Sequence, residues 1–451
     1  MKKIILSAAL GIFVCLNSMS SVSAQEPEAY SEVAFLAQET GIGARALGLG
    51  GAYMAVADDY TALYWNPAAL GLARTSELFL SLTHSKRTID TNFLSINGGL
   101  SQAKTAFGSA GFAYAVDTFQ GSLVFAAGYN RVHNYNSLFN YAGFNPGMTY
   151  MGYSFEIPDV PTDLYQEETV ETAGNLSQFA FGASIEVSEG VFIGGAFNFW
   201  NGQNNYNQTY SEVDDEDLYQ NDFDFYANET VIDTDINGFD MKLGLLYKYS
   251  EKLNLAATIN TPRFLTLDEN YSFNEDLVFD DGAIDYLDEY DDLGTFEYKM
   301  RLPFVFGTGV SYTLPNALIS AEIRYVDWTQ MEFRSEPSFN LTRNEANRNI
   351  KQTLESTVSP RVGVEFMLPD NRAKLRFGYA QVPSPIKDAD SGLDQKFFSG
   401  GFGMELGPDA SLDLVYRRGW WNTTVTSYYS DVPVSEEHVD HRVFASLSFR
   451  Y

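Results

Sequence analysis

Histidines and a glycine motif are the first residues to consider for chemistry in this 451-residue chain. His438 and His441 lie three residues apart at the expected start of a strand, where that spacing places their side chains on opposite faces. Residues 41–46 match the loose dinucleotide-binding pattern, but no strand and no βαβ unit accompany them. The chain lacks the GxSxG motif of hydrolases. We therefore predict no catalytic residue, no metal site and no cofactor, and we expect that the protein is not an enzyme.

Charged residues that could pair across a protein interior form the second candidate set. Arg45, Asp58 and Asp59 lie in an N-terminal segment without strand pattern, and further arginines lie in later strands. These arginines are Arg301, Arg324, Arg361, Arg376 and Arg417. If the N-terminal segment fills a closed sheet, pairing between the two sets would hold it, because partly buried charges need partners. An arginine could instead receive a ligand carboxylate through two parallel hydrogen bonds, and both roles stay open.

The segment of residues 41–70 is rich in glycine and alanine and precedes the first expected strand. Glycines give such a segment the backbone freedom that a gate needs. Pro67 near its end fixes its own φ and moves Asn66 away from helical geometry. The Asn66-Pro67-Ala68 tripeptide therefore either forms a pivot or ends the turn before the first strand. The candidate hatch or gating residues are Gly48, Gly50, Gly51, Asn66, Pro67 and Ala68.

Alternation of apolar with small or polar residues is the dominant pattern from about residue 77 to the end. In the last expected strand Val443, Leu447 and Phe449 alternate with Arg442 and Arg450. Apolar residues on one face and polar residues on the other are typical of a strand between lipid and an aqueous lumen.

Connection lengths decide between a soluble sandwich and a transmembrane barrel. Short turns such as residues 188–190 and 314–316 alternate with long connections such as residues 202–236 and 261–295. Transmembrane barrels have short turns on one side and long loops on the other. The sequence therefore favours a barrel.

We predict an all-β fold, a transmembrane antiparallel β-barrel of about fourteen strands with an N-terminal hatch, or plug, inside the lumen. Fifteen candidate strands are visible, but closure with both ends on one side requires an even number, so residues 92–100 are interpreted as a loop excursion before the second strand. The predicted regions are a signal peptide (1–24), the hatch (25–75) and the barrel with long acidic extracellular loops (76–451).

Composition agrees with an exported protein that does not bind nucleic acid. Residues 1–24 begin with two lysines, continue with an apolar run and end in Val-Ser-Ala, as an export signal does, and they contain the chain's one cysteine, Cys15. The formal net charge is −30, which argues against nucleic acid as a partner. Acidic residues concentrate in residues 212–235 and 268–297, which contain no lysine or arginine and are predicted to be solvated loops.

Aromatic residues make up 15% of the chain, and several lie where strands are expected to leave the bilayer. Tyr247, Tyr325, Trp328, Trp420 and Trp421 are predicted to belong to interfacial girdles.

Several motifs resemble one family of outer-membrane proteins. GARALGLGGAYMAVADD, followed by YWNPAAL, resembles the N-terminal hatch of the FadL/OmpP1/TodX transporters, and Asn66-Pro67-Ala68 matches the NPA of that family. IRYVDWTQM (323–331) and LRFGYAQVPSPI (375–386) are similar to later strands of the family. The hatch is also similar to that of PorV-like proteins of the type IX secretion apparatus.

The resemblance implies a multi-pass barrel in the bacterial outer membrane with both termini periplasmic. It implies passive uptake of long-chain fatty acids or other hydrophobic compounds through a gated, plugged barrel. The alternative is a PorV-like component or cargo-binding protein of a secretion system. In the FadL-like family the ligand leaves sideways near the third strand, here residues 122–131, where Gly128 is the candidate bend.

The expected partners are outer-membrane lipid and lipopolysaccharide, a hydrophobic small-molecule ligand and the barrel-assembly machinery. Phe449 and Tyr451 at the end of the last strand are predicted to be the barrel-assembly signal. No nucleic acid is expected.

Overall fold

The computed structural model describes residues 36, 39–150, 162–216, 223–286, 292–337, 341–369, 372–427, 429–430 and 432–451. The predicted signal peptide, residues 1–24, lies outside these residues. Within the described ranges no helix has the length and the apolar character needed to cross a membrane.

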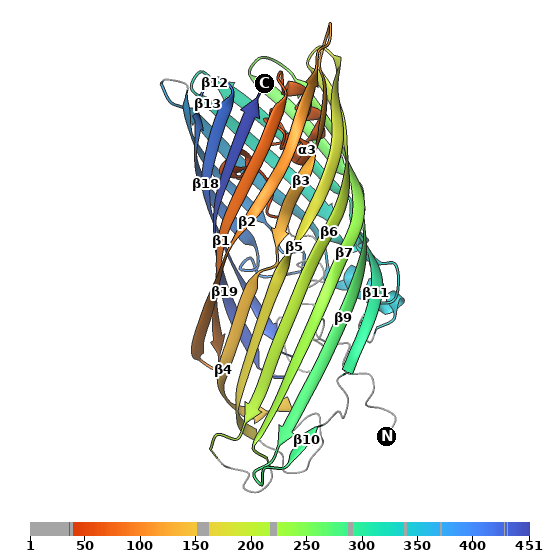
Figure 1. Cartoon of the computed structure of the whole chain (residues 1–451), viewed down its shortest axis with the longest axis vertical. Coiled ribbons are helices and arrows are strands. Elements are labelled where there is room, and N and C mark those ends of the chain that lie inside the picture. The colour runs from red at the N-terminus through yellow and green to blue at the C-terminus, as the bar shows by residue number, and fades with distance from the viewer. Residues whose placement is uncertain are drawn as a thin grey trace.

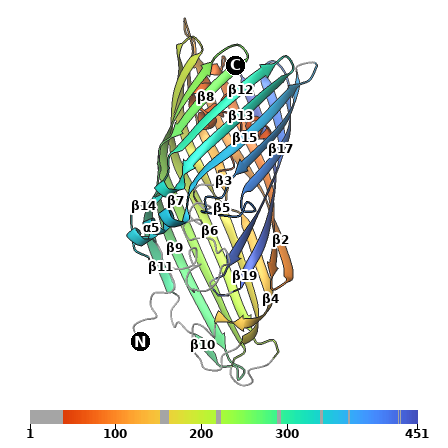
Figure 2. The same ribbon diagram turned by 180° about the vertical axis from the view of Figure 1, so that it is seen from behind.

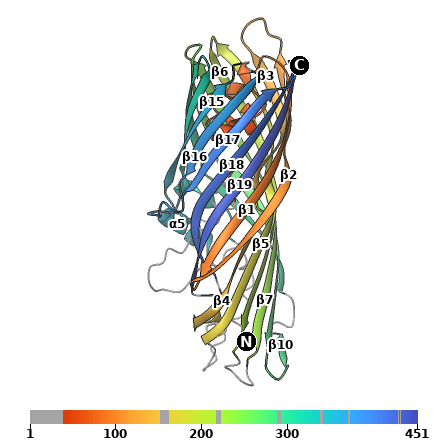
Figure 3. The same cartoon turned by 90° about the vertical axis from the view of Figure 1, so that its left-hand side faces the viewer.

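The described strands form one antiparallel sheet (Figure 1). They are β1 (Glu77–Phe93), β2 (Ile96–Val116), β3 (Leu123–Asn134), β4 (Ser137–Met148), β5 (Thr162–Ser188), β6 (Val191–Val213), β7 (Phe225–Lys248), β8 (Leu253–Asn260), β9 (Arg263–Val278), β10 (Ile284–Tyr286), β11 (Asp292–Leu302), β12 (Val305–Leu314), β13 (Ala317–Asp327), β14 (Glu332–Phe333), β15 (Ser356–Met367), β16 (Ala373–Val382), β17 (Gln395–Glu405), β18 (Ala410–Thr426) and β19 (Pro433–Arg450). β1 pairs with β2 on one side and with β19 on the other, which closes the sheet into a barrel (Figure 3). The predicted fold class is confirmed.

The nineteen described strands make fourteen wall strands, because three wall strands are interrupted and continue in a second segment, and the short strands β10 and β14 only pair with β9 and β11. β3 and β4 both pair with β5, and β8 and β9 both pair with β7. β11 and β12 form the third interrupted strand. Pro262 and Pro303 lie at two of the three interruptions, as expected for a residue that cannot donate a hydrogen bond to the ladder.

The interpretation of residues 92–100 as a loop excursion is wrong. β1 ends at Phe93 and β2 begins at Ile96, and only Leu94 and Ser95 connect them. Both connecting residues have positive φ, 49° and 69°, as in the tight turns that match the twist of paired strands. Two sequence candidates therefore merge into the single long strand β2, and the total of fourteen is preserved.

An apolar band on the outer face marks the part of the barrel that faces lipid. The exposed side chains of Phe199 and Phe239 lie on neighbouring strands and end this band towards the long-loop side. The next outward residues on the same strands are Asn201 and Asn237, whose side-chain amides are hydrogen-bonded at 3.2 Å. The change from phenylalanine to asparagine places the bilayer boundary between these two levels.

The acidic residues 212–235 and 268–297 are not simply loops. Most of their described residues belong to β7, β9 and β11, which project beyond the apolar band (Figure 1). Amide side chains of β6 donate to carboxylates of β7, as Gln203 does to Asp235 at 3.0 Å. These cross-strand pairs allow acid-rich segments to remain in a regular sheet.

The described residues 39–73, which precede β1, lie inside the barrel and contribute α2 (Ala44–Gly48), α3 (Ala62–Trp65) and the 3-10 helix η2 (Pro67–Leu72). α2 packs against β16 to β19, and η2 packs against β5, β6 and β7. We call the described residues 39–73 the hatch segment. It lies near the short-turn end of the barrel, where the C-terminus also lies (Figure 1).

A connection on one side of the barrel contains η3 (Trp328–Gln330) and α5 (Arg343–Thr353), as Figure 2 shows for α5 beside β14. Thr342 and Glu345 form a capping box at the start of α5, and Ile350 on its inner face is fully buried. This packing fixes the chain from which Trp328 reaches the interior.

Candidate functional site

The hatch segment fits the wall at three cross-strand pairs of glycines, which we call the glycine seats. The pairs are Gly111–Gly128, Gly194–Gly244 and Gly363–Gly378. A Cβ atom at any of these positions would collide with the hatch segment. The first seat receives the Tyr60 ring, the second the Asn66-Pro67-Ala68 motif, and the third the backbone at Leu49 and Gly50.

The predicted gating glycines take part in this fit. Gly50 and Gly51 have φ of 65° and 78°, the left-handed region that favours glycine. A Cβ at Gly48 would lie 3.0 Å from a methyl group of Val415. These glycines therefore allow close approach of the segment to the wall, and their role in movement stays a prediction.

Asn66 holds the hatch segment to itself and to the wall. Its side chain accepts from the Ala68 N–H at 3.1 Å and donates to the carbonyls of Met54 at 2.9 Å and Leu245 at 3.3 Å. With ψ of 102°, Asn66 is the extended N-cap of η2, and Pro67 is the first residue of that helix. The motif thus caps η2 and attaches the hatch segment to β7 through the hydrogen bond to Leu245. Its function as a pivot stays a prediction.

Arg45 of the hatch segment pairs with the wall, but with Glu365 and not with a predicted residue, and Arg376 contacts wall carboxylates only. Arg45 Nη1 contacts Asp58 at 2.6 Å, and its Nε contacts Glu365 of β15 at 3.0 Å. Arg376 of β16 contacts the same Glu365 carboxylate at 2.6 Å and Asp413 at 2.5 Å. Burial alone would lower the pKa of Arg45, but Asp58 and Glu365 raise it well above its usual value, so the guanidinium stays charged.

Two predicted residues play other parts. Asp59 accepts from the Thr61 N–H at 2.9 Å and from the Tyr53 hydroxyl at 2.9 Å, within the hatch segment itself. Burial, and next the Asp58 carboxylate, raise the pKa of Asp59. Arg301 does not face the hatch segment: Met300 and Leu302 are the inward residues of β11, and Arg301 pairs with Glu332 of β14 at 3.2 Å. The prediction that Arg301 faces the lumen is wrong, because its two neighbours in the strand occupy the inward positions.

Arg324 and Arg361 meet at Glu322, a buried wall residue. The Glu322 carboxylate accepts from Arg324 at 2.9 Å and from Arg361 at 3.4 Å on one oxygen. Its other oxygen accepts from the backbone N–H groups of Tyr53 at 3.1 Å and Met54 at 3.2 Å. One carboxylate therefore joins two wall arginines to a turn of the hatch segment.

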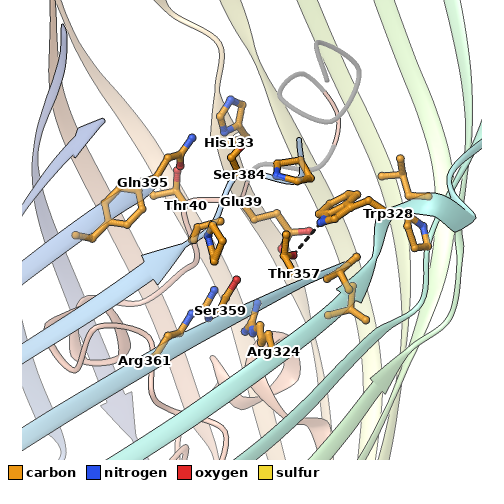
Figure 4. Close-up of a pocket in the computed structure, with 18 of the residues that line it drawn as sticks. Glu39, Thr40, His133, Arg324, Trp328, Thr357, Ser359, Arg361, Ser384 and Gln395 are labelled. Atoms are coloured by element: carbon orange, nitrogen blue, oxygen red, sulfur yellow. Dashed lines mark hydrogen bonds between the residues drawn. The ribbon is translucent and has the colours of Figure 1, made fainter. Parts of the chain in front are cut away.

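Between the hatch segment and the wall lies a lumen cavity with about 1370 Å³ of unfilled space, including the part continuous with solvent (Figure 4). One side is apolar and includes Leu302, Pro303, Val326, Trp328 and Pro385. Trp328 donates through its ring N–H to Thr357 at 2.9 Å, which fixes the indole in the cavity wall. The other side carries arginines, among them Arg324 and Arg361 in Figure 4.

Glu39 and Thr40, which we call the arm, enter this cavity from the start of the hatch segment (Figure 4). The Glu39 carboxylate accepts from Arg263 and from the Tyr64 hydroxyl. Burial alone would raise the pKa of Glu39, but Arg263, Tyr64 and Lys242 lower it from its usual value of 4.5 to about 2. The arm therefore places a charged carboxylate among the arginines.

The wall is interrupted next to the cavity. The β2–β3 ladder ends at the pair of Ser109 and Asn130, although β2 continues to Ile96. Beyond this pair a bulge at residues 131–133 shifts β3 against β5, and the chain resumes as β4. Gly128 lies within the regular ladder and belongs to the first seat, so the predicted bend at Gly128 is wrong and the irregularity begins three residues later.

Sequence reasoning missed several residues of this region. Trp328 and Trp421, predicted for the interfacial girdles, line the cavity instead. Glu39 and Thr40 lie in a segment without pattern, and no sequence signal marks them. The three glycine pairs could have been found as glycines on the polar face of neighbouring strands.

Comparison with known proteins places these features in context. A family model described as outer membrane protein transport protein (OMPP1/FadL/TodX) matches residues 22–446. The fold is similar to that of the P. putida toluene transporter TodX, with 15% identity and a TM-score of 0.58 over 91% of this chain and 99% of that one. A Pseudomonas aeruginosa FadL homologue has 13% identity and a TM-score of 0.61 over 92% and 98%. The Ralstonia pickettii toluene transporter TbuX has 16% identity and a TM-score of 0.54 over 91% and 98%. No curated protein sequence matches the chain.

Proposed function

Because the chain belongs to the OMPP1/FadL/TodX family of outer membrane transport proteins, we propose that it carries hydrophobic compounds, long-chain fatty acids among them, passively across the outer membrane. Two of the structural relatives are toluene transporters, which supports an apolar cargo. We place the hatch segment and both termini on the periplasmic side, with the acidic strands outside the cell.

The lumen cavity is the observation that carries this proposal. It lies between the hatch segment and the place where the β2–β3 ladder ends, and one of its sides is apolar. The hatch segment lies between a ligand held there and the short-turn end, and a movement of that segment opens the route, either towards that end or sideways through the wall near residues 131–136. Lipid and lipopolysaccharide would border such an exit.

A reversible lock of the hatch segment tests the proposal. Ala44 donates its backbone N–H to the Ser446 hydroxyl at 2.9 Å, so cysteines at these two positions would lie close enough to form a disulfide. No other cysteine remains once the predicted signal peptide is removed.

The double variant, inserted into the outer membrane of cells that lack other such transporters, should take up labelled oleate only after reduction. The single variant Ala44→Cys under the same oxidation controls for chemical damage. Equal uptake by the oxidised and reduced double variant would overturn the proposal.

A further inference from the structure

Three neighbouring strands carry two consecutive basic residues each, and the strands lie side by side in Figure 3. The pairs are Lys86-Arg87 in β1, Arg417-Arg418 in β18 and His441-Arg442 in β19. The arginine of each pair that lines the lumen cavity is Arg87, Arg417 or Arg442. Because successive side chains of a strand point to opposite faces, the other three lie on the outer face of the barrel. We call Lys86, Arg418 and His441 the basic row.

Strand pairing brings the members of the basic row together. His441 is directly opposite Lys86 on one side and directly opposite Arg418 on the other. The Tyr416 hydroxyl lies 2.6 Å from Nδ1 of His441, and the two rings are stacked, which fixes the imidazole between the two cations. Like charges at directly opposite positions of a sheet are destabilising. The row therefore lowers stability unless an anion compensates it.

No carboxylate of the described chain compensates the basic row. Lys86 and Arg418 are exposed, and neither forms an ion pair among the described residues. The next carboxylates on the outer face of β1 and β19 are Asp90 and Glu437, four residues farther towards the long-loop side, or about 13 Å along the strand. The chain as a whole has 59 acidic and 29 basic residues, so acid is not scarce on this protein. The compensating anion is therefore expected from outside the chain.

The basic row lies where the lipid-facing band ends. On β19 the outward positions from Phe449 to Val443 are apolar, and the next outward residue is His441. On β6 the outward positions from Ile193 to Phe199 precede Asn201, the residue at which the band ends there. Both strands thus place four outward residues between the short-turn end and the polar level, so the row lies at the same boundary of the bilayer.

Aromatic residues mark this boundary on β18 as well. Tyr416 and Trp420 are the outward residues on either side of Arg418, and both are partly exposed, as in an interfacial girdle. Lys396 of β17 is directly opposite Trp420 and adds a further cation one outward step beyond the row. Its Nζ donates to the Ser391 carbonyl at 3.3 Å. The row therefore faces the head groups of the leaflet on the long-loop side.

We propose that the basic row binds a phosphate group of lipopolysaccharide in the outer leaflet. Lipid A carries its phosphates where the acyl chains meet the sugars, which is the level of the row. Arginine and lysine bind phosphate through charge-assisted hydrogen bonds. Val443 and Tyr416 adjoin the row on the side of the band, so a ligand gains apolar burial there only if it carries acyl chains. The inference rests on one part of the proposed function, the placement of the long-loop side outside the cell, and not on the cargo.

Equilibrium binding of two probes to the full mature protein in detergent tests the proposal. The probes are radiolabelled lipid A and the same lipid A after enzymatic removal of its phosphates, which share their acyl chains and differ in charge. The parent should bind the phosphorylated form about tenfold more tightly or better. The double variant Lys86→Gln/Arg418→Gln should lose this preference, with heat-modifiable migration as the check that the barrel is folded.

Arg74→Gln/Lys252→Gln is the matched control, since it removes the same charge from two exposed residues near the short-turn end. This variant should keep the preference of the parent. The inference is overturned if the parent binds both probes equally, if Lys86→Gln/Arg418→Gln keeps the preference, or if the control loses it. Displacement of lipid A by an equal concentration of inorganic phosphate would identify a site for the free anion and would also overturn it.

Transport is read out separately. Because the basic row faces away from the cavity, Lys86→Gln/Arg418→Gln should take up labelled oleate like the parent. Blocked uptake in the oxidised Ala44–Ser446 lock, together with any of the overturning results above, would remove the inference and leave the proposed transport function standing.

Discussion

Replacing Glu365 by glutamine should loosen the hatch segment without unfolding the barrel. Glu365 accepts three hydrogen bonds from two arginines: Arg45 Nε at 3.0 Å, Arg45 Nη2 at 3.2 Å and Arg376 Nε at 2.6 Å. A glutamine of the same shape has one acceptor oxygen, so its amide nitrogen would face a guanidinium N–H. Arg45 keeps Asp58 and Arg376 keeps Asp413, so neither guanidinium is left without a carboxylate.

The free energy by which Glu365→Gln destabilises the closed state follows from these contacts. Hydrogen bonds to charged groups contribute about 1.5–3 kcal/mol each, and one is lost outright in the variant. Since about 1.4 kcal/mol corresponds to a factor of ten, the population with a released hatch segment should rise roughly 10- to 100-fold.

A cysteine at Ala46 reports this release, because Ala46 is 1% exposed in the closed state. The measured quantity is the rate at which a water-soluble thiol reagent modifies that cysteine, with heat-modifiable migration on gels as the check that the barrel is folded. Glu332→Gln is the matched control, since it weakens the partly exposed pairs with Arg301 and Arg334, and such pairs contribute about 0–1 kcal/mol each. A modification rate in Glu365→Gln no higher than in Glu332→Gln would refute the reasoning.

Three further predictions concern the hatch segment. Asn66→Ala leaves buried backbone groups of the hatch segment without partners, at a cost of about 1–3 kcal/mol, and should raise the modification rate of the Ala46 cysteine. An unchanged rate would contradict the role of Asn66 in holding the hatch segment to the wall. Gly378→Val places a side chain against Gly50 and should expose the reporter cysteine in a folded barrel, whereas Gly400→Val, with open space around its Cβ, should not. Because the folded pKa of Glu39 is depressed from 4.5 to about 2, the stabilisation that its contact with Arg263 gives to the closed state is fully present above about pH 4.5 and is lost as pH falls towards 2. In planar bilayers the open probability of the parent channel should therefore rise below about pH 4.5. The Glu39→Gln variant should not show this pH-dependent rise.

The wall could be predicted from the sequence because its signals are local. Alternation and loop length are properties of consecutive residues, so they identify strands and their number even where residues 92–100 were assigned wrongly. The inward or outward direction of one side chain is more fragile, since a strand that begins one residue earlier reverses every assignment. This is why Arg301 was placed on the wrong face, and why the inward positions of Trp328 and Trp421 were missed.

The cavity could not be predicted because its contacts are distant in sequence. Thr40 contacts Arg417 and Arg442, about four hundred residues later, and nothing in the hatch composition signals that meeting. Glu322 and Glu365 were missed for a similar reason, since nothing in the neighbouring sequence distinguishes them from other polar positions of a strand.

The glycine seats have a consequence for how the protein is made. Each seat is a place where two neighbouring strands carry no side chain on their inner surface, so the segment that fills it acts as part of the interior core. Without that filling, the wall would expose bare backbone at three places and enclose voids that destabilise it. We therefore expect the barrel to close around the hatch segment, which is already in place when the first and last strands pair during membrane insertion. A truncated chain that begins at β1 would be a different and weaker barrel, not an open form of this one.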